Sequence, residues 1–194
     1  MEDAGLAGLH VEDQVNPKRC GHLDGKQVVD LDTAVKRVRA AVEGRRDPAF
    51  LVMARTDVRA LDGLDVAVDR AKALVDAGAD AIFPEALVGL AEFEAVAEAV
   101  GVPVLANMTE FGKGELHTVD QLRDAGVRIV IWPVTLLRLA MGEAGRGLDE
   151  IAVTGTQAAL LDRMQHRADL YDLVDYGGYS TFDGGVFDFT VERG

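Results

Sequence analysis

The residues of this chain that are best placed for chemistry lie in one short stretch, Lys18-Arg19-Cys20-Gly21-His22. Cys20 is the only cysteine among 194 residues, and three potentially cationic side chains flank it in a chain of formal net charge -13. Nearby positive charge stabilises a thiolate, and the thiolate is the reactive form of cysteine. The pattern therefore predicts that this thiol takes part in chemistry.

Composition and charge exclude several classes of function. A length of 194 residues with 48% hydrophobic content suffices for one substantial core, and the strong negative charge argues against nucleic acid and anionic membrane surfaces as partners. A single cysteine cannot form an intrachain disulfide, and no apolar run approaches the roughly 20 residues that span a bilayer. The first residues, Met1-Glu2-Asp3-Ala4-Gly5, lack the pattern of a signal peptide. We therefore expect a cytoplasmic protein with neither nucleic acid nor membrane as partner.

A repeated unit must position the reactive residues. The tripeptide Asp-Ala-Gly occurs three times, at 3–5, 76–78 and 124–126, and a short apolar run follows each copy. Glycine just past a helix end commonly takes the left-handed conformation that stops the helix, and a short apolar run is typical of a buried strand. Because only two residues precede the first copy, we expect the chain to begin at the end of such a unit.

The elements that follow from this unit alternate along the chain. Apolar residues three or four apart predict a helix over 90–100, a further helix is expected over 34–42, and Thr118-Val119-Asp120-Gln121 has the form of a capping box. Strands are expected near 7–12, 50–54, 80–84, 102–107 and 128–132. Strands that alternate with helices imply a parallel sheet covered on its faces, and nearly continuous apolar runs imply strands buried on both sides.

Polar residues follow each expected strand. Glu12, Arg55, Glu85 and Asn107 stand at or just after the ends of the first four apolar runs, and Thr135 follows the fifth. In a barrel of parallel strands these ends converge on the face where barrel enzymes keep their sites. A single such residue is more often a helix cap or part of a loop ion pair, but several together favour a site.

The cationic residues suggest the kind of ligand. Lys18, Arg19 and Arg55 could gather around a polyanionic substrate, because a guanidinium group binds a carboxylate with two parallel hydrogen bonds. Arg138 and Arg167 are expected on helices, where a solvated surface arginine is the default. Met108 is typical of a core residue that fills irregular space.

Several motifs together resemble the isocitrate lyase and phosphoenolpyruvate mutase superfamily, and within it the methylisocitrate lyase subgroup. The resemblance runs from about residue 4 to residue 176. The motifs that carry it are Gly8-Leu9-His10-Val11-Glu12-Asp13-Gln14, Lys18-Arg19-Cys20-Gly21-His22, Arg55-Thr56-Asp57, Phe83-Pro84-Glu85-Ala86, Asn107-Met108-Thr109-Glu110-Phe111-Gly112, Gly155-Thr156-Gln157 and Met164-Gln165-His166-Arg167.

The resemblance implies an α/β fold, a (β/α)8 TIM-type barrel, of which residues 1–176 would supply about strands 4–8 and C-terminal helices. Residues 177–194 are Gly-rich and weakly patterned, so a loose terminus is expected there. Members of the family form homotetramers by swapping a C-terminal helix, which implies a homo-oligomer. Their magnesium-binding aspartates and a serine-containing loop lie on earlier strands, for which this sequence has no counterpart.

The same resemblance implies an activity: cleavage of the tricarboxylate 2-methylisocitrate to pyruvate and succinate, with Mg2+ as cofactor, in propionate catabolism. Cys20 would be the general acid, with Lys18 and His22 as further catalytic residues. Glu12 would reach the metal through water. The residues implied in substrate binding are Cys20, Gly21, Arg55, Glu85, Asn107, Met108, Thr109, Arg138 and Arg167.

Alternatives remain open at this point. The chain could be a lyase for isocitrate or for another 2-hydroxy or alkylmalate-type acid, or a non-catalytic pseudoenzyme or assembly subunit. Because the family's direct metal ligands are missing from the sequence, we expect negligible lyase activity from this polypeptide by itself, even with magnesium added.

Overall fold

The computed structural model describes residues 1–21 and 23–188 and forms two compact units, Met1–Leu137 and Arg138–Gly194. The first unit is a parallel α/β structure, as the sequence predicts. Its strands are β1 (Gly8–Glu12), β2 (Leu51–Thr56), β3 (Ala81–Pro84), β4 (Leu105–Asn107) and β5 (Ile129–Ile131).

All strand pairs are parallel. One sheet has the order β1-β2-β3 and a second pairs β4 with β5, and a bridge between Ile82 and Val104 links them. Glu12 is the register partner of Arg55, so the carboxyl ends of β1 and β2 lie level. The register therefore brings the polar residues that follow the strands to one edge.

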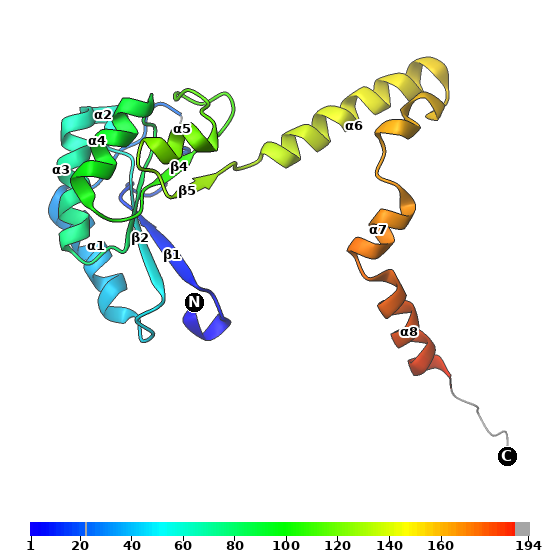
Figure 1. Cartoon of the computed structure of the whole chain (residues 1–194), viewed down its shortest axis with the longest axis horizontal. Coiled ribbons are helices and arrows are strands. Elements are labelled where there is room, and N and C mark those ends of the chain that lie inside the picture. The colour runs from blue at the N-terminus through cyan, green and yellow to red at the C-terminus, as the bar shows by residue number, and fades with distance from the viewer. Residues whose placement is uncertain (22, 189–194) are drawn as a thin grey trace. The chain divides into compact units, whose positions relative to one another are not determined.

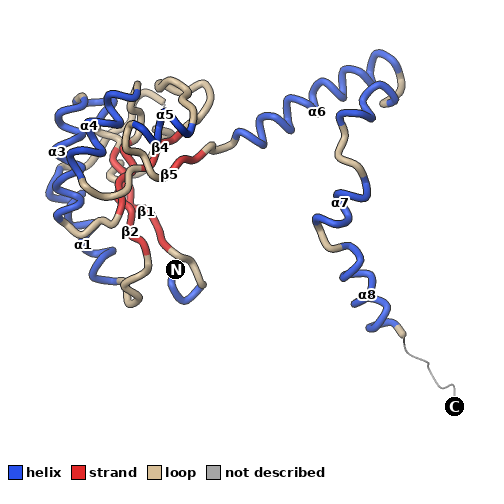
Figure 2. Tube along the Cα trace, viewed as in Figure 1, coloured by secondary structure: helices blue, strands red, loops and turns tan. Residues whose placement is uncertain are grey.

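Helices pack against one face of these strands. They include α1 (Leu31–Gly44), α3 (Leu64–Asp76) and α4 (Leu90–Val100). The same unit also contains the 3-10 helix η1 (Glu2–Ala4) and the short helices α2 (Arg59–Asp62) and α5 (Val119–Asp124). Helices α1, α3 and α4 lie on the same side of the strands (Figures 1 and 2). The main core fills the space between, with Val38 from α1, Leu74 from α3 and Val96 from α4 packed towards the sheet.

Glycines and a capping box end or begin several helices where the sequence predicts them. Gly5 takes a left-handed conformation (φ 79°) and closes η1, as expected for the first Asp-Ala-Gly copy. Gly126 also has a positive φ (86°), and a Cβ there would lie 2.6 Å from the Ala97 Cβ of α4. The capping box of α5 is present, since Thr118 and Gln121 each accept a hydrogen bond from the backbone N–H of the other.

Burial on both faces, which was predicted for every strand, is found only in part. Strand β3 is buried throughout, and β2 is buried except at Leu51 and Arg55. Strands β1 and β5 are half-buried for most of their length, because each pairs with one neighbouring strand among the described residues. On the face away from α1 and α3, a smaller cluster of Met53, Ala81, Phe83 and Leu105 covers the sheet.

The second unit is helical. It contains most of α6 (Thr135–Thr154), then the 3-10 helix η2 (Ala158–Arg163), α7 (Arg167–Leu173) and α8 (Tyr176–Phe187). No residue of α6, α7 or α8 is buried. In α8 the Asp175 side chain accepts the Gly178 N–H and caps the first turn. The loose terminus expected over 177–194 stays a prediction, and residues 189–194 lie outside the described part of the chain. No helix in the described part of the chain has the length and apolar character needed to cross a membrane.

Candidate active site

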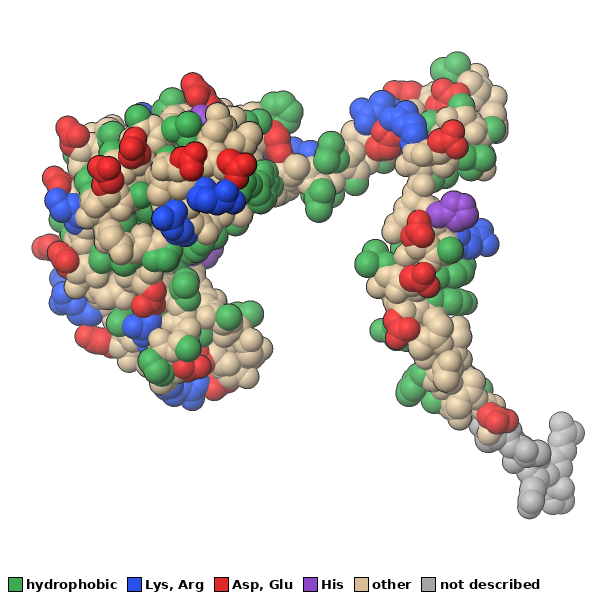
Figure 3. Space-filling view, in the orientation of Figure 1, with side chains coloured by type: hydrophobic (Ala, Val, Ile, Leu, Met, Phe, Trp, Pro, Cys, Tyr) green, Lys and Arg blue, Asp and Glu red, His purple; other side chains and the backbone are tan. Residues whose placement is uncertain are grey.

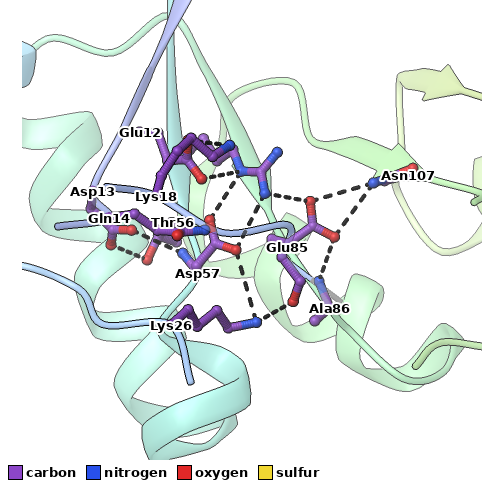
Figure 4. A network of polar contacts seen from close by, with 12 residues as sticks. Glu12, Asp13, Gln14, Lys18, Lys26, Thr56, Asp57, Glu85, Ala86 and Asn107 are labelled. Atoms are coloured by element: carbon purple, nitrogen blue, oxygen red, sulfur yellow. Dashed lines mark hydrogen bonds and ion pairs between the residues drawn. The ribbon is translucent and has the colours of Figure 1, made fainter. Parts of the chain in front are cut away.

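Side chains from the ends of four strands meet around the guanidinium group of Arg55 (Figure 4). Arg55 Nε lies 3.3 Å from Glu12 Oε1, and Arg55 Nη2 lies 3.0 Å from Glu85 Oε2. Asn107 Nδ2 donates to the same Glu85 oxygen at 3.3 Å. The guanidinium carbon also lies 4.7 Å from the centre of the Phe83 ring. The predicted convergence of these four strand ends is confirmed.

Asp57 and Lys26 are two further buried members of this cluster. Asp57 is fully buried two residues beyond Arg55, and its Oδ2 accepts from Arg55 Nε at 3.0 Å. Lys26 Nζ lies 3.9 Å from Asp57 Oδ1 and donates to the carbonyl of Gly21. Sequence reasoning missed Lys26, because a lysine in a polar loop is normally solvated, whereas this side chain is 2% exposed.

Burial affects the pKa values of Lys26 and Arg55. Burial lowers the pKa of the Lys26 ammonium, and the attraction of Asp57 offsets this only in part. For Arg55, burial is the largest single effect and would lower its pKa, but Asp57, Glu85 and Glu12 together outweigh it and raise the pKa above its ordinary value. Arg55 therefore stays charged and is held by carboxylates on three sides.

The loop that carries Cys20 packs directly on this cluster. Gly21 is buried, and a Cβ at this position would lie 2.4 Å from Glu85 Cγ, 2.6 Å from Asp57 Oδ1 and 2.7 Å from Arg55 Nη2. Only glycine leaves room for these three side chains. The adjacent Cys20 is an exposed free thiol.

Gln14 holds the other side of the same loop. Its Nε2 donates to the Arg19 carbonyl at 3.0 Å, and its Oε1 accepts the Arg19 N–H at 2.9 Å. The basic setting predicted for Cys20 is found only in part, because Lys18 Nζ is 2.7 Å from Glu12 Oε2, a carboxylate that partly neutralises it. His22 lies outside the described residues, so its predicted role stays a prediction.

Asp13, directly after β1, is buried and fixes the end of β2 by hydrogen bonds. It is 3% exposed and accepts hydrogen bonds from Thr56 Oγ1 at 2.6 Å, from the Asp57 N–H at 3.0 Å and from Arg70 Nη1 at 3.1 Å. Burial raises the pKa of the Asp13 carboxyl above its ordinary value, and the bonds from the Thr56 hydroxyl and the Asp57 N–H together with the charge of Arg70 offset this only in part. The backbone of Asp57 is thus fixed where its side chain meets Arg55.

Two buried acceptor atoms in the cluster have no hydrogen-bond donor among the described residues. They are Glu12 Oε1 and Asn107 Oδ1. An unsatisfied buried acceptor costs roughly 1–3 kcal/mol, so its presence calls for an explanation. Both belong to side chains that touch the group around Arg55, and both can accept from a ligand hydroxyl or from water. The cluster therefore offers acceptors beside a fixed cation.

Four further residues belong to the predicted site. Thr109 is half-buried, whereas Met108 is 4% exposed in the main core, where its sulfur accepts the His117 N–H at 3.4 Å. Arg138 on α6 and Arg167 on α7 belong to the second unit, so their part in substrate binding stays a prediction.

A parallel α/β sheet with an ion cluster and a thiol-bearing loop at its carboxyl edge is the arrangement of an enzyme site at strand ends. The family model described as phosphoenolpyruvate phosphomutase matches residues 1–152. The chain belongs to the phosphoenolpyruvate phosphomutase family.

Curated relatives are named for one activity. The chain is 56% identical over 192 residues to a probable 2-methylisocitrate lyase 2 of Corynebacterium glutamicum, covering 99% of this chain and 62% of that protein. It is 46% identical over 179 residues to the 2-methylisocitrate lyase of Escherichia coli, covering 92% of this chain and 60% of the relative. The chain thus spans about three-fifths of the length of the curated relatives it matches.

Solved structures of the same superfamily share the fold. An oxaloacetate acetylhydrolase in complex with 3,3-difluorooxalacetate matches with a TM-score of 0.85 at 31% identity, covering 97% of this chain and 64% of that chain. A 2,3-dimethylmalate lyase, described as a phosphoenolpyruvate mutase/isocitrate lyase superfamily member, matches with a TM-score of 0.82 at 32% identity, covering 98% and 65%.

Proposed function

We propose that the cluster around Arg55, together with the Cys20 loop, serves a carbon–carbon lyase that cleaves 2-methylisocitrate to pyruvate and succinate. The observation that supports the proposal is the seating of Gly21, the residue after Cys20, directly on Arg55, Asp57 and Glu85. The names of the 44–56% identical relatives support this choice of substrate over the alternatives.

The reaction divides into two proton movements around one bond cleavage. A base takes the proton of the substrate hydroxyl, the oxygen lone pair forms the carbonyl of pyruvate, and the carbon–carbon bond breaks. Its electron pair moves onto the other fragment, which becomes the aci-carboxylate of succinate. Cys20 then gives its proton to the carbanionic carbon, a step of general acid catalysis that typically contributes about 10²- to 10⁴-fold in rate.

The residues of the cluster have matching tasks in this reaction. Arg55, fixed by Asp57 and Glu85, presents positive charge to a substrate carboxylate, and a preorganised charge stabilises the added negative charge of the aci-carboxylate. Asn107 Oδ1, and Glu12 Oε1, which the Arg55 guanidinium faces at 3.3 Å without a hydrogen bond, would accept from the substrate hydroxyl or from a water bound to it. Lys18 holds Glu12 from the loop side.

Magnesium belongs to the proposal only in a limited way. The described residues contain no group of three or more His, Cys, Asp or Glu side chains that could hold a metal ion. Glu12, which is proposed to approach the metal through water, already faces Lys18 and Arg55. These residues do not by themselves fit a magnesium ion, so no step above uses one. When bound in a lyase of this type, magnesium would supply Lewis-acid neutralisation on the keto-acid side.

The finer architecture is also part of the proposal. We infer that β1–β5 correspond to strands 4–8 of a (β/α)8 barrel, which the parallel order and the bridge between Ile82 and Val104 support. We further infer a homo-oligomer, a tetramer with swapped helices. Within the second unit, hydrophobic side chains are exposed on the helices (Figure 3). They include Leu139 (63% exposed), Leu148 (69%) and Val153 (85%). Exposed apolar surface of this kind marks an interaction site, and light scattering on the purified chain measures the oligomer.

The experiment that tests the activity is a chimera. Residues 1–194 replace the aligned stretch of the 56% identical Corynebacterium glutamicum relative, and pyruvate release from 2-methylisocitrate is compared with glyoxylate release from isocitrate. The proposal expects turnover of 2-methylisocitrate in preference to isocitrate. A folded chimera that releases no pyruvate would overturn it. Negligible turnover by the 194-residue chain alone stays a prediction, measured in the same assay.

A further inference from the structure

The backbone beside Cys20 is held by a buried lysine that has no part in the reaction described above. Lys26 Nζ donates a hydrogen bond to the carbonyl of Gly21, the residue directly after Cys20. We propose that Lys26 is the positioning residue of the Cys20 loop: it holds Gly21 on the cluster of Arg55, Asp57 and Glu85 and thereby fixes where the thiol stands. This inference rests on the proposed function for the meaning of that position.

The contacts of Lys26 point to the loop as its main partner. Its side chain is 2% exposed, and its distance to Asp57 Oδ1, 3.9 Å, exceeds that of a hydrogen bond. Asp57 is instead bonded by Arg55 at 3.0 Å. Burying an ammonium group is costly, and burial lowers the pKa of Lys26 while the attraction of Asp57 offsets this only in part. The direct contact that the buried ammonium makes in return is to the Gly21 carbonyl.

The loop is held on both sides of the thiol. Gln14 fixes the Arg19 peptide group through two hydrogen bonds, and Lys26 fixes the Gly21 carbonyl. Cys20 lies between these two points, with an exposed side chain. A proton donor misplaced by about 1 Å can lose roughly 10²-fold in rate, so two anchors around one residue suit a group that must deliver a proton to a defined carbon.

The anchoring can be measured on the 194-residue chain without any lyase assay. In Lys26→Met, amide hydrogen exchange at Leu23, whose N–H donates to the Cys20 carbonyl at 2.9 Å, should become about tenfold faster or more, because a charge-assisted hydrogen bond is lost. Exchange at Leu74 in α3, 1% exposed in the core, should stay unchanged. Lys26→Arg, which keeps a cationic donor, should restore part of the protection.

The matched control is Lys72→Met, which removes an exposed lysine whose Nζ is 3.4 Å from Asp69. It should change neither amide. The rate of alkylation of Cys20, the only thiol in the chain, gives a second readout of loop freedom. We expect this rate, measured at one fixed pH, to change in Lys26→Met and to return towards the parent value in Lys26→Arg.

The outcomes separate the role of Lys26 from the proposed lyase function. Unchanged exchange at Leu23 in a folded Lys26→Met protein would overturn the role of Lys26 whatever the activity. Equal acceleration at Leu23 and Leu74 would also overturn it, because the lysine would then support the whole fold. Acceleration confined to the loop, together with a chimera that releases no pyruvate, supports the anchor and refutes the proposed function. If amide exchange is faster only in the loop, and Lys26→Met in the chimera lowers kcat about tenfold or more with KM nearly constant, the role of Lys26 and the proposed function are both supported.

Discussion

Replacing Gly21 by alanine tests how tightly the loop is seated. The added Cβ would lie 2.4 Å from Glu85 Cγ, 2.6 Å from Asp57 Oδ1 and 2.7 Å from Arg55 Nη2. The side chains of Glu85 and Asp57 are 1% and 0% exposed, and that of Arg55 is 11% exposed, so none of the three is a flexible end that can swing into solvent. The methyl group must therefore displace either the cluster or the loop.

The two routes bound the cost of Gly21→Ala. If the cluster yields, the change is an overpacking of a well-filled site, which typically costs about 1–3 kcal/mol. If the loop lifts instead, the hydrogen bond from the Lys26 ammonium to the Gly21 carbonyl is lost, at roughly 1.5–3 kcal/mol. Either route lowers the free energy of unfolding by about 1–3 kcal/mol.

Urea denaturation at neutral pH measures this cost, with Gly44→Ala as the matched control. Gly44 is the last residue of α1, and a Cβ there would meet nothing within 4 Å. Alanine is favoured over glycine in helices by up to about 1 kcal/mol, so the control should be neutral or slightly stabilised. A Gly21→Ala protein as stable as Gly44→Ala, with normal protection of the loop amides, would refute the tight seating of the loop.

Two further changes probe the polar network under the site. Asp13→Asn should lower the free energy of unfolding by about 3 kcal/mol, because it leaves the buried Arg70 guanidinium without its carboxylate. A loss below about 1 kcal/mol in urea denaturation would contradict the role of Asp13 in fixing the strand ends. Glu92→Gln should flatten the acid limb of the stability curve. Burial acts to raise the pKa of Glu92, but bonds from Arg59 and the Val88 N–H outweigh it and lower that pKa below its ordinary value of 4.5. The stabilisation is therefore present above pH 4.5 and lost as the pH falls through the lower folded-state pKa. Thermal melts between about pH 6 and about pH 3 measure the slope, and an unchanged slope would count against this linkage.

The sequence predicts the strands and the convergence of their ends because both follow from local pattern. A short apolar run marks each strand, a glycine stop precedes most of them, and parallel pairing then brings Glu12, Arg55, Glu85 and Asn107 to one edge. The same pattern overstated burial for β1 and β5, since an apolar run does not tell whether a strand has one neighbour or two. It also missed α8, whose glycines disfavour a helix but whose first turn is capped by Asp175.

The polar network beneath the site could not be predicted for a different reason. Asp13 and Arg70 are 57 positions apart in the sequence, and their pairing depends on the packing of α3 against the strands. Gln14 and Lys26 have the residue types of a solvated surface, and only the path of the loop buries them. Long-range contacts of this kind depend on the tertiary fold, so the partners cannot be predicted from periodicity or from a local motif.

The central claim is that Cys20 donates the proton that completes carbon–carbon cleavage, from a loop fixed on the Arg55 cluster. The most direct measurement is the steady-state rate of pyruvate release from 2-methylisocitrate by the chimera and by its Cys20→Ala variant. We predict a kcat lower by about 10²- to 10⁴-fold with KM within a few-fold of the parent, because the thiol acts in the transition state more than in binding. A Cys20→Ala chimera that releases pyruvate at the parent rate would contradict the claim.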